Sequence, residues 1–347
     1  MKLKAIAFIL LLSFSPFKYL LSSEKVKVNT LDSMFIYTSA PFPQCHASTI
    51  VETKDGLLAS WFGGTRERNP DVCIYTSVLK NGKWSTPVMV ADGIENETLR
   101  YPCWNPVLFR NPGGMIDLYY KVGPTPQDWW GILISSRDEG KTWSAPVRLP
   151  DGILGPIKNK PILLQSGLIL SPSSTENSQT WKSHIECSAN GGKTWTNIPI
   201  NTPDSVKVIQ PTLLQYPGGK IQALLRSNQN FIMDSWSADE GKTWTKAERT
   251  SILNPNSGID AVTLKSGLQV LIYNPMKHGK NWDVGRNKLN VAISSDGKIW
   301  QDLVVLEDQP KGEFSYPAII QGQDGTLHIT YTHNRTKIKY IHLRLDE

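Results

Sequence analysis

Hydrophobic and polar positions along this chain form a repeated unit of two short apolar segments joined by a polar turn that contains glycine. The apolar segments have the length of strands, and no useful stretch shows the 3.6-residue period of a helix, so the pattern predicts an all-β chain. The segments that follow the turn glycines are Leu57–Phe62, Met115–Tyr120, Leu168–Pro172, Lys220–Leu225, Leu268–Tyr273 and Thr326–Tyr331.

A second repeat, with the pattern Ser-x-Asp-x-Gly-x-Thr-Trp, lies between these units. It occurs at 136–143, at 188–195 with Asn190 in the Asp place, at 237–244 and, one residue shorter, at 294–300; a worn copy occupies 81–84. Asp accepts hydrogen bonds from backbone amides and Gly tolerates positive φ, so each copy predicts a tight hairpin turn whose Trp packs into the core. We therefore expect these motifs to be structural.

The spacing of the repeats predicts the architecture. The motif tryptophans recur every 49–59 residues, which is the length of one four-stranded blade, and six apolar units indicate a six-bladed β-propeller. Because ring closure removes exposed sheet edges, we expect the segment after the N-terminal region to complete the last blade. No linker composition divides the chain, so 24–347 is interpreted as one domain.

The first residues have the pattern of an export signal. A basic start at 1–4 precedes an unbroken apolar run at 5–14, and Ser22 and Ser23 offer a cleavage point, so 1–23 is interpreted as a signal peptide. The run is too short to span a bilayer, and a buried N-terminal helix is the alternative. We expect a periplasmic or secreted protein without a stable membrane span.

Charge and cysteine content narrow the possible ligands only slightly. The net charge of +6 favours an acidic ligand weakly, and without a basic run or basic helix we expect no nucleic-acid partner. The cysteines show no CxxC spacing, so we expect neither a metal nor a cofactor. Three full pairings, or free thiols, remain open for Cys45, Cys73, Cys103 and Cys187.

Aligning the six units on their glycines brings polar residues to equivalent places. One set precedes the inner strands: His46, Trp104–Asn105, Asn159–Lys160, Gln210, Asp260 and Ser315–Tyr316. Another stands seven residues after each glycine: Gly63, Lys121, Ser174, Arg226, Asn274 and Thr332. Equivalent strand ends of a propeller meet at one mouth of its axial channel, so the polar set predicts a ligand site. Alternatively these side chains satisfy loop backbone, the better interpretation for Asn159 and Asn274.

The turn motifs and the strand–turn–strand units resemble those of the sialidase (neuraminidase) superfamily over roughly 35–345, which implies an exo-acting glycosidase. In that family three Arg residues hold the carboxylate of sialic acid, a Tyr paired with a Glu is the nucleophile, and an Asp is the acid/base. The resemblance implies these roles here: Arg226 and Arg286 in the clamp, Tyr316 as nucleophile and Asp71 as acid/base.

Two positions depart from the family pattern. His46 stands where the family has its first Arg, and a His is charged only when its pKa permits. Gln210 stands in the place of the Glu and cannot take a proton from Tyr316. The alternative carboxylates for this base are Glu176, Glu186 and Glu313.

The leading prediction is a monomeric glycoside hydrolase acting on an acidic oligosaccharide or glycoconjugate that carries sialic acid or a uronate. Lys121, Lys158 and Lys160 are expected to widen the positive mouth, and Arg66 is expected to bind the substrate. Trp104, Trp129 or Trp130 is expected to stack on a sugar ring, with blade packing as the alternative for each.

Two alternatives use the same scaffold. One is a polysaccharide lyase or a glycosidase of another chemistry that uses His46 and Tyr316. In the lyase these would serve as base and acid beside a uronate whose carboxylate Arg226 neutralises. A non-catalytic carbohydrate-binding propeller is the other alternative, and the departures at His46 and Gln210 favour it.

Overall fold

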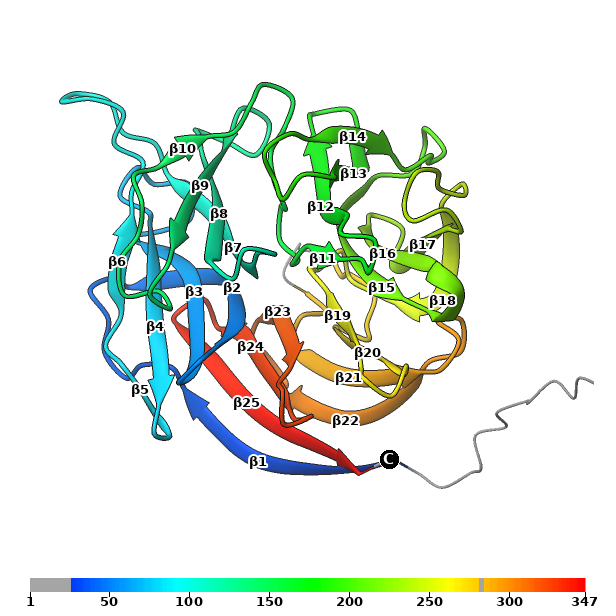
Figure 1. The fold of residues 1–347 in the computed structure, drawn as a ribbon. Coiled ribbons are helices and arrows are strands. Elements are labelled where there is room, and N and C mark those ends of the chain that lie inside the picture. The colour runs from blue at the N-terminus through cyan, green and yellow to red at the C-terminus, as the bar shows by residue number, and fades with distance from the viewer. Residues whose placement is uncertain (1–25, 281–283, 347) are drawn as a thin grey trace, which may run out of the picture.

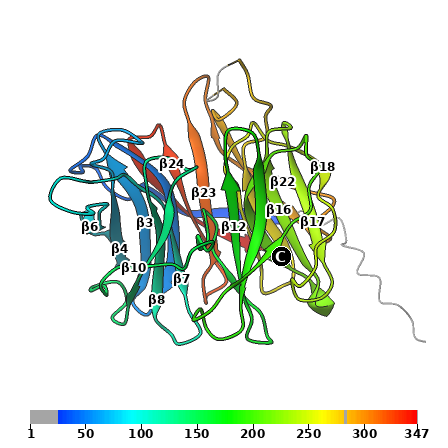
Figure 2. The same cartoon turned by 90° about the horizontal axis from the view of Figure 1, so that it is seen from above.

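The computed structural model describes residues 26–280 and 284–346 and arranges them as six antiparallel sheets around a central axis (Figure 1). The predicted all-β, six-bladed propeller is confirmed. Seen from above, the blades stand side by side around the axis (Figure 2). The predicted signal peptide, 1–23, lies outside the described residues. Within those residues no helix is long and apolar enough to cross a membrane.

Each blade runs from an inner strand at the axis to an outer strand at the rim. Blade 1 contains β2 (Gln44–Thr53), β3 (Gly56–Gly64), β4 (Cys73–Lys80) and β5 (Lys83–Trp84), with β6 (Val88–Ala91) also paired to β4. Blade 2 contains β7 (Cys103–Arg110), β8 (Ile116–Val122), β9 (Trp130–Ser136) and β10 (Val147–Arg148). Blade 3 contains β11 (Ile162–Leu163), β12 (Ile169–Glu176), β13 (Trp181–Ser188) and β14 (Thr196–Pro199).

The second half of the chain continues the same order. Blade 4 contains β15 (Val208–Gln215), β16 (Ile221–Ser227), β17 (Phe231–Ser237) and β18 (Glu248–Leu253), with the 3₁₀ turn η1 (Pro217–Gly219) between its first two strands. Blade 5 contains β19 (Asp260–Thr263), β20 (Gln269–Tyr273), β21 (Lys288–Ser294) and β22 (Gln301–Asp308). Blade 6 contains β23 (Phe314–Gln321), β24 (Leu327–His333), β25 (Lys337–Asp346) and β1 (Lys27–Phe35).

Blade 6 joins the two ends of the described chain. β1 pairs antiparallel with β25, with Lys27 opposite Asp346 and Phe35 opposite Lys339 (Figure 1). The expectation that the segment following 1–23 completes the last blade is therefore confirmed. This pairing occupies the edge that β25 would otherwise expose.

The Ser-x-Asp-x-Gly-x-Thr-Trp motifs form the turns that the sequence predicts. At 237–244 the Asp239 carboxylate accepts hydrogen bonds from the backbone N (2.9 Å) and hydroxyl (2.6 Å) of Thr243, while Ser237 Oγ accepts one from the N of Gly241 (2.8 Å). These bonds lower the pKa of Asp239 to about 2. Trp244 is only partly buried and packs against the hydrophobic cluster between blades 3 and 4. The motif thus shapes a hairpin rather than a site.

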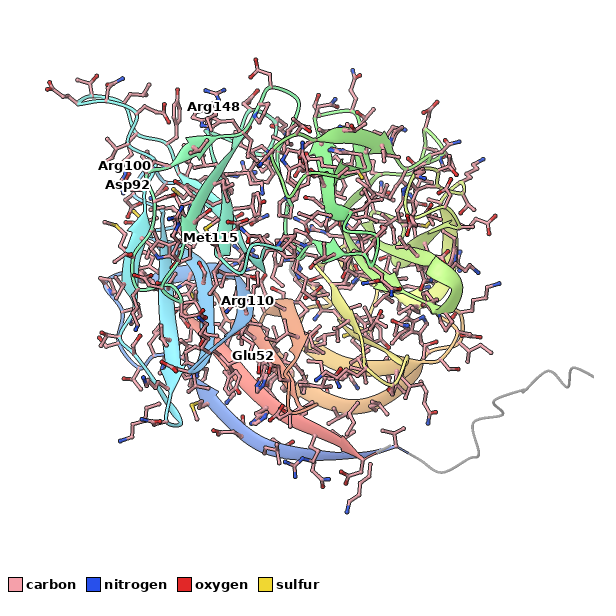
Figure 3. The ribbon with its side chains drawn as sticks, viewed as in Figure 1. Glu52, Asp92, Arg100, Arg110, Met115 and Arg148 are labelled. Carbon is pink, nitrogen blue, oxygen red and sulfur yellow. The ribbon has the colours of Figure 1, made fainter. Side chains whose placement is uncertain are left out.

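The opposite ends of the inner strands are also joined between blades. Arg110 of β7 donates a hydrogen bond to the backbone carbonyl of Glu52 on β2 (2.9 Å) and forms an ion pair with Glu139 (2.6 Å) (Figure 3). Glu52 lies near the end of β2, far from the polar residues at its beginning. One mouth of the axis therefore has the Arg110–Glu139 ion pair, and the other has the polar residues at the beginning of the inner strands.

Trp61 fills the seam between the last blade and the first. Its side chain is fully buried, and its ring stacks on that of Tyr37, with centroids 5.3 Å apart. The same cluster contains Ile338 and Tyr340 of β25. Ring closure therefore depends on this apolar contact as well as on the pairing of β1 with β25.

We expect Trp61→Ala to lower the free energy of unfolding by about 3–5 kcal/mol, because it opens a cavity in this seam. Chemical denaturation measures the loss. Ile299→Ala is the control, since that side chain is 77% exposed and should change stability by less than about 0.5 kcal/mol. Equal stabilities for the two variants would show that the seam does not support closure.

Candidate active site

A cavity of about 730 Å³ opens at the mouth where the inner strands begin. Residues from several blades line it, so it exists only in the closed ring. The predicted site residues among its walls are Arg66, Trp104, Gln210, Arg226, Arg286 and Tyr316. Its walls also include residues that the sequence did not single out as site residues: Glu67, Arg68, Trp181 and Arg335. Glu176, considered from the sequence only as a replacement base, lines it too.

Bulges in four inner strands shape this mouth. The pairing register breaks in β2, β7, β15 and β23 at equivalent positions. At each break one residue other than glycine has positive φ: Ala47 (57°), Asn105 (35°), Gln210 (54°) and Tyr316 (52°). Such conformations cost of order 1–3 kcal/mol each and persist where the surrounding structure imposes them. The bulges change the direction of these four residues, which include Gln210 and Tyr316 of the cavity wall.

Arg226 links the two bulge residues of blades 4 and 6. Its Nη1 donates hydrogen bonds to the phenol oxygen of Tyr316 (2.6 Å) and to Oε1 of Gln210 (3.0 Å), and its Nε donates to Oδ1 of Asn256 (2.8 Å). All three acceptors are neutral groups. The Gln210 side chain, predicted near Arg226 and Tyr316, therefore contacts the guanidinium of Arg226, which also contacts Tyr316.

Glu313 bridges two further arginines of the cavity. Its Oε1 lies 2.9 Å from Nη1 of Arg286, and its Oε2 lies 2.7 Å from Nε of Arg335. Burial raises the pKa of Glu313, but the two guanidinium groups outweigh it and hold the pKa below its usual value. Glu313 is thus an anion that pairs with Arg286 and Arg335 rather than a base for Tyr316.

Arg335 was missed in the sequence. It lies in the turn between β24 and β25 with φ of 54°, and its backbone carbonyl accepts a hydrogen bond from the N of Cys45 in blade 1 (2.8 Å). Its guanidinium forms an ion pair with Glu67 and approaches Nε2 of His46 to 3.5 Å. A positive group from blade 6 therefore stands beside the place where the family pattern has its first Arg. Arg335 follows Gly325 by ten residues, so an alignment extended past the seventh residue would have found it.

His46 lies behind Tyr316 and is not among the described residues that line the large cavity. It is 2% exposed, and its ring centroid is 4.1 Å from that of Tyr316. Burial, together with the charges of Arg335 and Arg286, lowers the pKa of His46 well below its usual value. His46 is therefore a neutral packing partner of Tyr316.

Asp71 is bonded to its own loop. Its Oδ2 accepts hydrogen bonds from the backbone N (2.8 Å) and hydroxyl (2.6 Å) of Thr65, and it is not among the described cavity-lining residues. Burial raises the pKa of Asp71, but the bonds from Thr65 outweigh this and lower it. The Asp71 side chain is therefore an anion bonded within its own loop, and its role as acid/base stays a prediction.

Trp130 also lies away from the cavity. Its ring packs against Tyr101, and the guanidinium of Arg148, labelled in Figure 3, lies 4.7 Å from its centroid. The neighbouring Trp129 lines the cavity and packs against Trp104 with centroids 5.9 Å apart. Successive residues of an extended chain point to opposite sides, so only one of the two tryptophans can face a sugar.

Lys121 and Lys160 lie away from the cavity walls and brace the axis. Lys121 is fully buried and donates a hydrogen bond to the backbone carbonyl of Pro156; burial lowers its pKa to about 7. Lys160 forms an ion pair with Asp260 (2.9 Å) and also donates to the carbonyl of Ala261. The spacing of residues along the sequence alone does not distinguish a position at the mouth from one in the interior.

The remaining chemistry of the described residues is simple. Cys45, Cys73, Cys103 and Cys187 are all free thiols. In 26–280 and 284–346 no group of three or more His, Cys, Asp or Glu side chains is placed to hold a metal ion.

Comparison with known proteins agrees with this geometry. A family model described as the BNR repeat-like domain matches residues 55–329. A protein named sialidase from Bacteroides fragilis (strain YCH46) is 25% identical over 218 residues, which cover 58% of this chain and 39% of that protein. The chain thus spans about two fifths of the length of this relative.

Solved structures share the fold at low sequence identity. A protein of unknown function from Dyadobacter fermentans has a TM-score of 0.75 and 18% identity, over 92% of this chain and 99% of that one. The NanB sialidase from Streptococcus pneumoniae has a TM-score of 0.71 and 13% identity, over 90% and 70% of the two chains. Their likeness to this chain concerns the propeller.

We expect the His46 ring to stay unprotonated from pH 8 to pH 5, because burial and the nearby guanidinium charges oppose a further positive charge. Nuclear magnetic resonance of the ring nitrogens, assigned with His46→Gln, measures this. Below about pH 6.5 the unfolded chain binds a proton that the folded chain does not, so the contribution of His46 to stability falls as pH falls. A titration midpoint near 6.5 would contradict the neutral assignment.

Proposed function

This chain belongs to the BNR repeat-like domain family, and we propose that it is a glycoside hydrolase acting on an acidic sugar. The observation that carries the proposal is the gathering of Arg226, Arg286 and Arg335 in one cavity with Tyr316. Guanidinium groups bind carboxylates through paired, charge-assisted hydrogen bonds. A sugar that carries a carboxylate is therefore the ligand that this cavity fits best.

The three arginines differ in how much of their charge the protein already neutralises. Arg286 and Arg335 share Glu313, and Arg335 also pairs with Glu67. Arg226 has neutral hydrogen-bond acceptors and no ion pair among the described residues. Of these three arginines, Arg226 therefore supplies positive charge that no carboxylate of the protein neutralises, while Arg286 and Arg335 orient the substrate carboxylate.

Tyr316 is the group proposed to act at the reacting carbon. A carboxylate nucleophile would be repelled by a carboxylate on the sugar, whereas a neutral phenol is not. The hydrogen bond from Arg226 stabilises negative charge on the phenol oxygen. Gln210 cannot accept the phenol proton, so Tyr316 acts without a carboxylate partner. It keeps its proton and stabilises positive charge on the carbon through its oxygen, or it attacks the carbon while its proton passes to water.

Relatives guide the choice of first substrates. The Bacteroides fragilis relative is named a sialidase, so sialosides are the first compounds to test and uronate-capped glycans the second. A lyase would need His46 to reach a substrate proton, and the burial of His46 behind Tyr316 argues against that role. A lyase product would absorb in the ultraviolet, and binding without any product would indicate a carbohydrate-binding propeller.

We expect Tyr316→Phe to reduce release of the acidic sugar by at least about 100-fold, because the phenol oxygen at the reacting carbon is lost. Chromatography of the released sugar measures turnover, and a thermal melt checks the fold. The matched control is Tyr273→Phe, which removes a hydroxyl bonded to Asp302 outside the cavity. Full activity in Tyr316→Phe would refute the assignment.

We expect Arg226→Gln to reduce the preference for the free acid over its methyl ester by about 10- to 100-fold in kcat/KM. The estimate follows from ~1.5–3 kcal/mol for a hydrogen bond to a charged group. Competition between acid and ester substrates measures the ratio. Arg137→Gln, on an exposed residue away from the cavity, is the control and should leave the preference unchanged. An unaltered preference in Arg226→Gln would remove Arg226 from the carboxylate site.

A further inference from the structure

We propose that Glu176 is the proton donor of this site and protonates the leaving oxygen as the glycosidic bond breaks. The inference rests on the proposed glycosidase function and deepens it. Such a reaction needs an acid on the leaving-group side, and Asp71, the residue that the family pattern suggests, is turned to Thr65 instead.

Glu176 lines the cavity from the end of a strand of blade 3. It is the last residue of β12 and pairs across the hairpin with Trp181, the first residue of β13. Both side chains line the cavity together with Arg226 and Tyr316. Glu176 is thus held at a strand end, on a different blade from Tyr316.

The other carboxylates at or beside the cavity are already engaged. Glu67 forms an ion pair with Arg335, and Glu313 is held between Arg286 and Arg335. No hydrogen bond or ion pair engages the carboxyl of Glu176 within the part of the chain that the structure describes. Glu176 is therefore the cavity carboxyl that can meet a leaving oxygen without breaking a contact of the protein.

Its environment favours the protonated form. Burial raises the pKa of Glu176, and the charges of Arg226 and Arg68 offset this only in part. By contrast, the pKa values of Asp71 and Glu313 lie below their usual range. Carboxyl groups whose surroundings separate their pKa values in this way divide into an acid and stable anions.

The proposed step balances with water as the co-reactant. The O–H bond of the Glu176 carboxyl breaks and its proton joins the glycosidic oxygen, which takes the electron pair of the breaking bond to carbon and leaves as an alcohol. The resulting Glu176 carboxylate then accepts a proton from the water that attacks the same carbon. The acidic sugar is released and Glu176 is protonated again.

The test compares two glycosides of the same acidic sugar, one with an alkyl alcohol and one with a nitrophenol as leaving group. We expect Glu176→Gln to lower kcat/KM on the alkyl glycoside by about 10²- to 10⁴-fold. The nitrophenyl glycoside, whose leaving group needs little protonation, should lose less than tenfold. A merely structural role would lower both rates equally, and a thermal melt checks the fold of the variant.

The pH profile gives a second readout. In the wild type, kcat/KM on the alkyl glycoside should fall as pH rises through the raised pKa of Glu176, because the acid is lost. This alkaline fall should disappear in Glu176→Gln. Glu97→Gln, on an exposed residue outside the cavity, is the matched control and should keep the wild-type profile and rates.

The outcomes separate the two proposals. Turnover by the wild type with equal losses on both glycosides in Glu176→Gln overturns the role of Glu176 and leaves the glycosidase intact. A leaving-group split in Asp71→Asn rather than in Glu176→Gln gives the role to Asp71. No turnover of any acidic glycoside by the wild type overturns the glycosidase, and the role of Glu176 with it.

Discussion

The pairing of β1 with β25 is the interaction on which the rest of the structure depends. Each blade is a small twisted sheet that cannot bury both faces alone, and an open arc of blades would expose apolar surface at its ends. The N-terminal strand closes the arc, and Trp61 fills the seam that closure creates. Once the ring is closed, the inner strands of all six blades meet at one axis. Only then do residues more than 250 positions apart, such as Glu67 and Arg335, come into contact.

Closure concentrates positive charge at one mouth, and the site is organised around that charge. Three guanidinium groups near one another repel, and the chain reduces the repulsion by placing Glu313 between two of them and Glu67 beside Arg335. The same field keeps His46 neutral. Arg226 has neutral partners, so the cavity retains positive charge for a ligand. The bulges that carry Gln210 and Tyr316 hold strained backbone at this point, which is where a binding site benefits from rigid positioning.

The chain has the propeller fold of its family, but some charged side chains of its cavity come from other strands and turns than the family pattern predicts. His46 lies where an Arg is expected, yet Arg335 reaches the same region from the last hairpin. The carboxylate of Asp71 is bonded within its own loop, and Glu176 supplies a carboxyl to the cavity from blade 3. The low identity to solved sialidases agrees with such exchange, because the fold constrains where side chains converge but not which strand delivers each one.

The sequence by itself determined the blades, the turns and the pairing of the chain ends. Blades and turns arise from hydrogen bonds and apolar contacts between near neighbours, as in the turn at Ser237–Trp244, and from a regular repeat. The pairing of β1 with β25 follows from the need of the ring to close. It also identified Arg226, Gln210 and Tyr316, since equivalent strand positions in a propeller share one mouth, and the family resemblance added Arg286. Only the tertiary structure decided that Trp129 rather than Trp130 faces the cavity, that Lys121 and Lys160 brace the axis, and that Arg335 and Glu176 join the site. The direction of a loop side chain and the charge of a buried group depend on partners from other blades, and spacing along the chain carries no record of them.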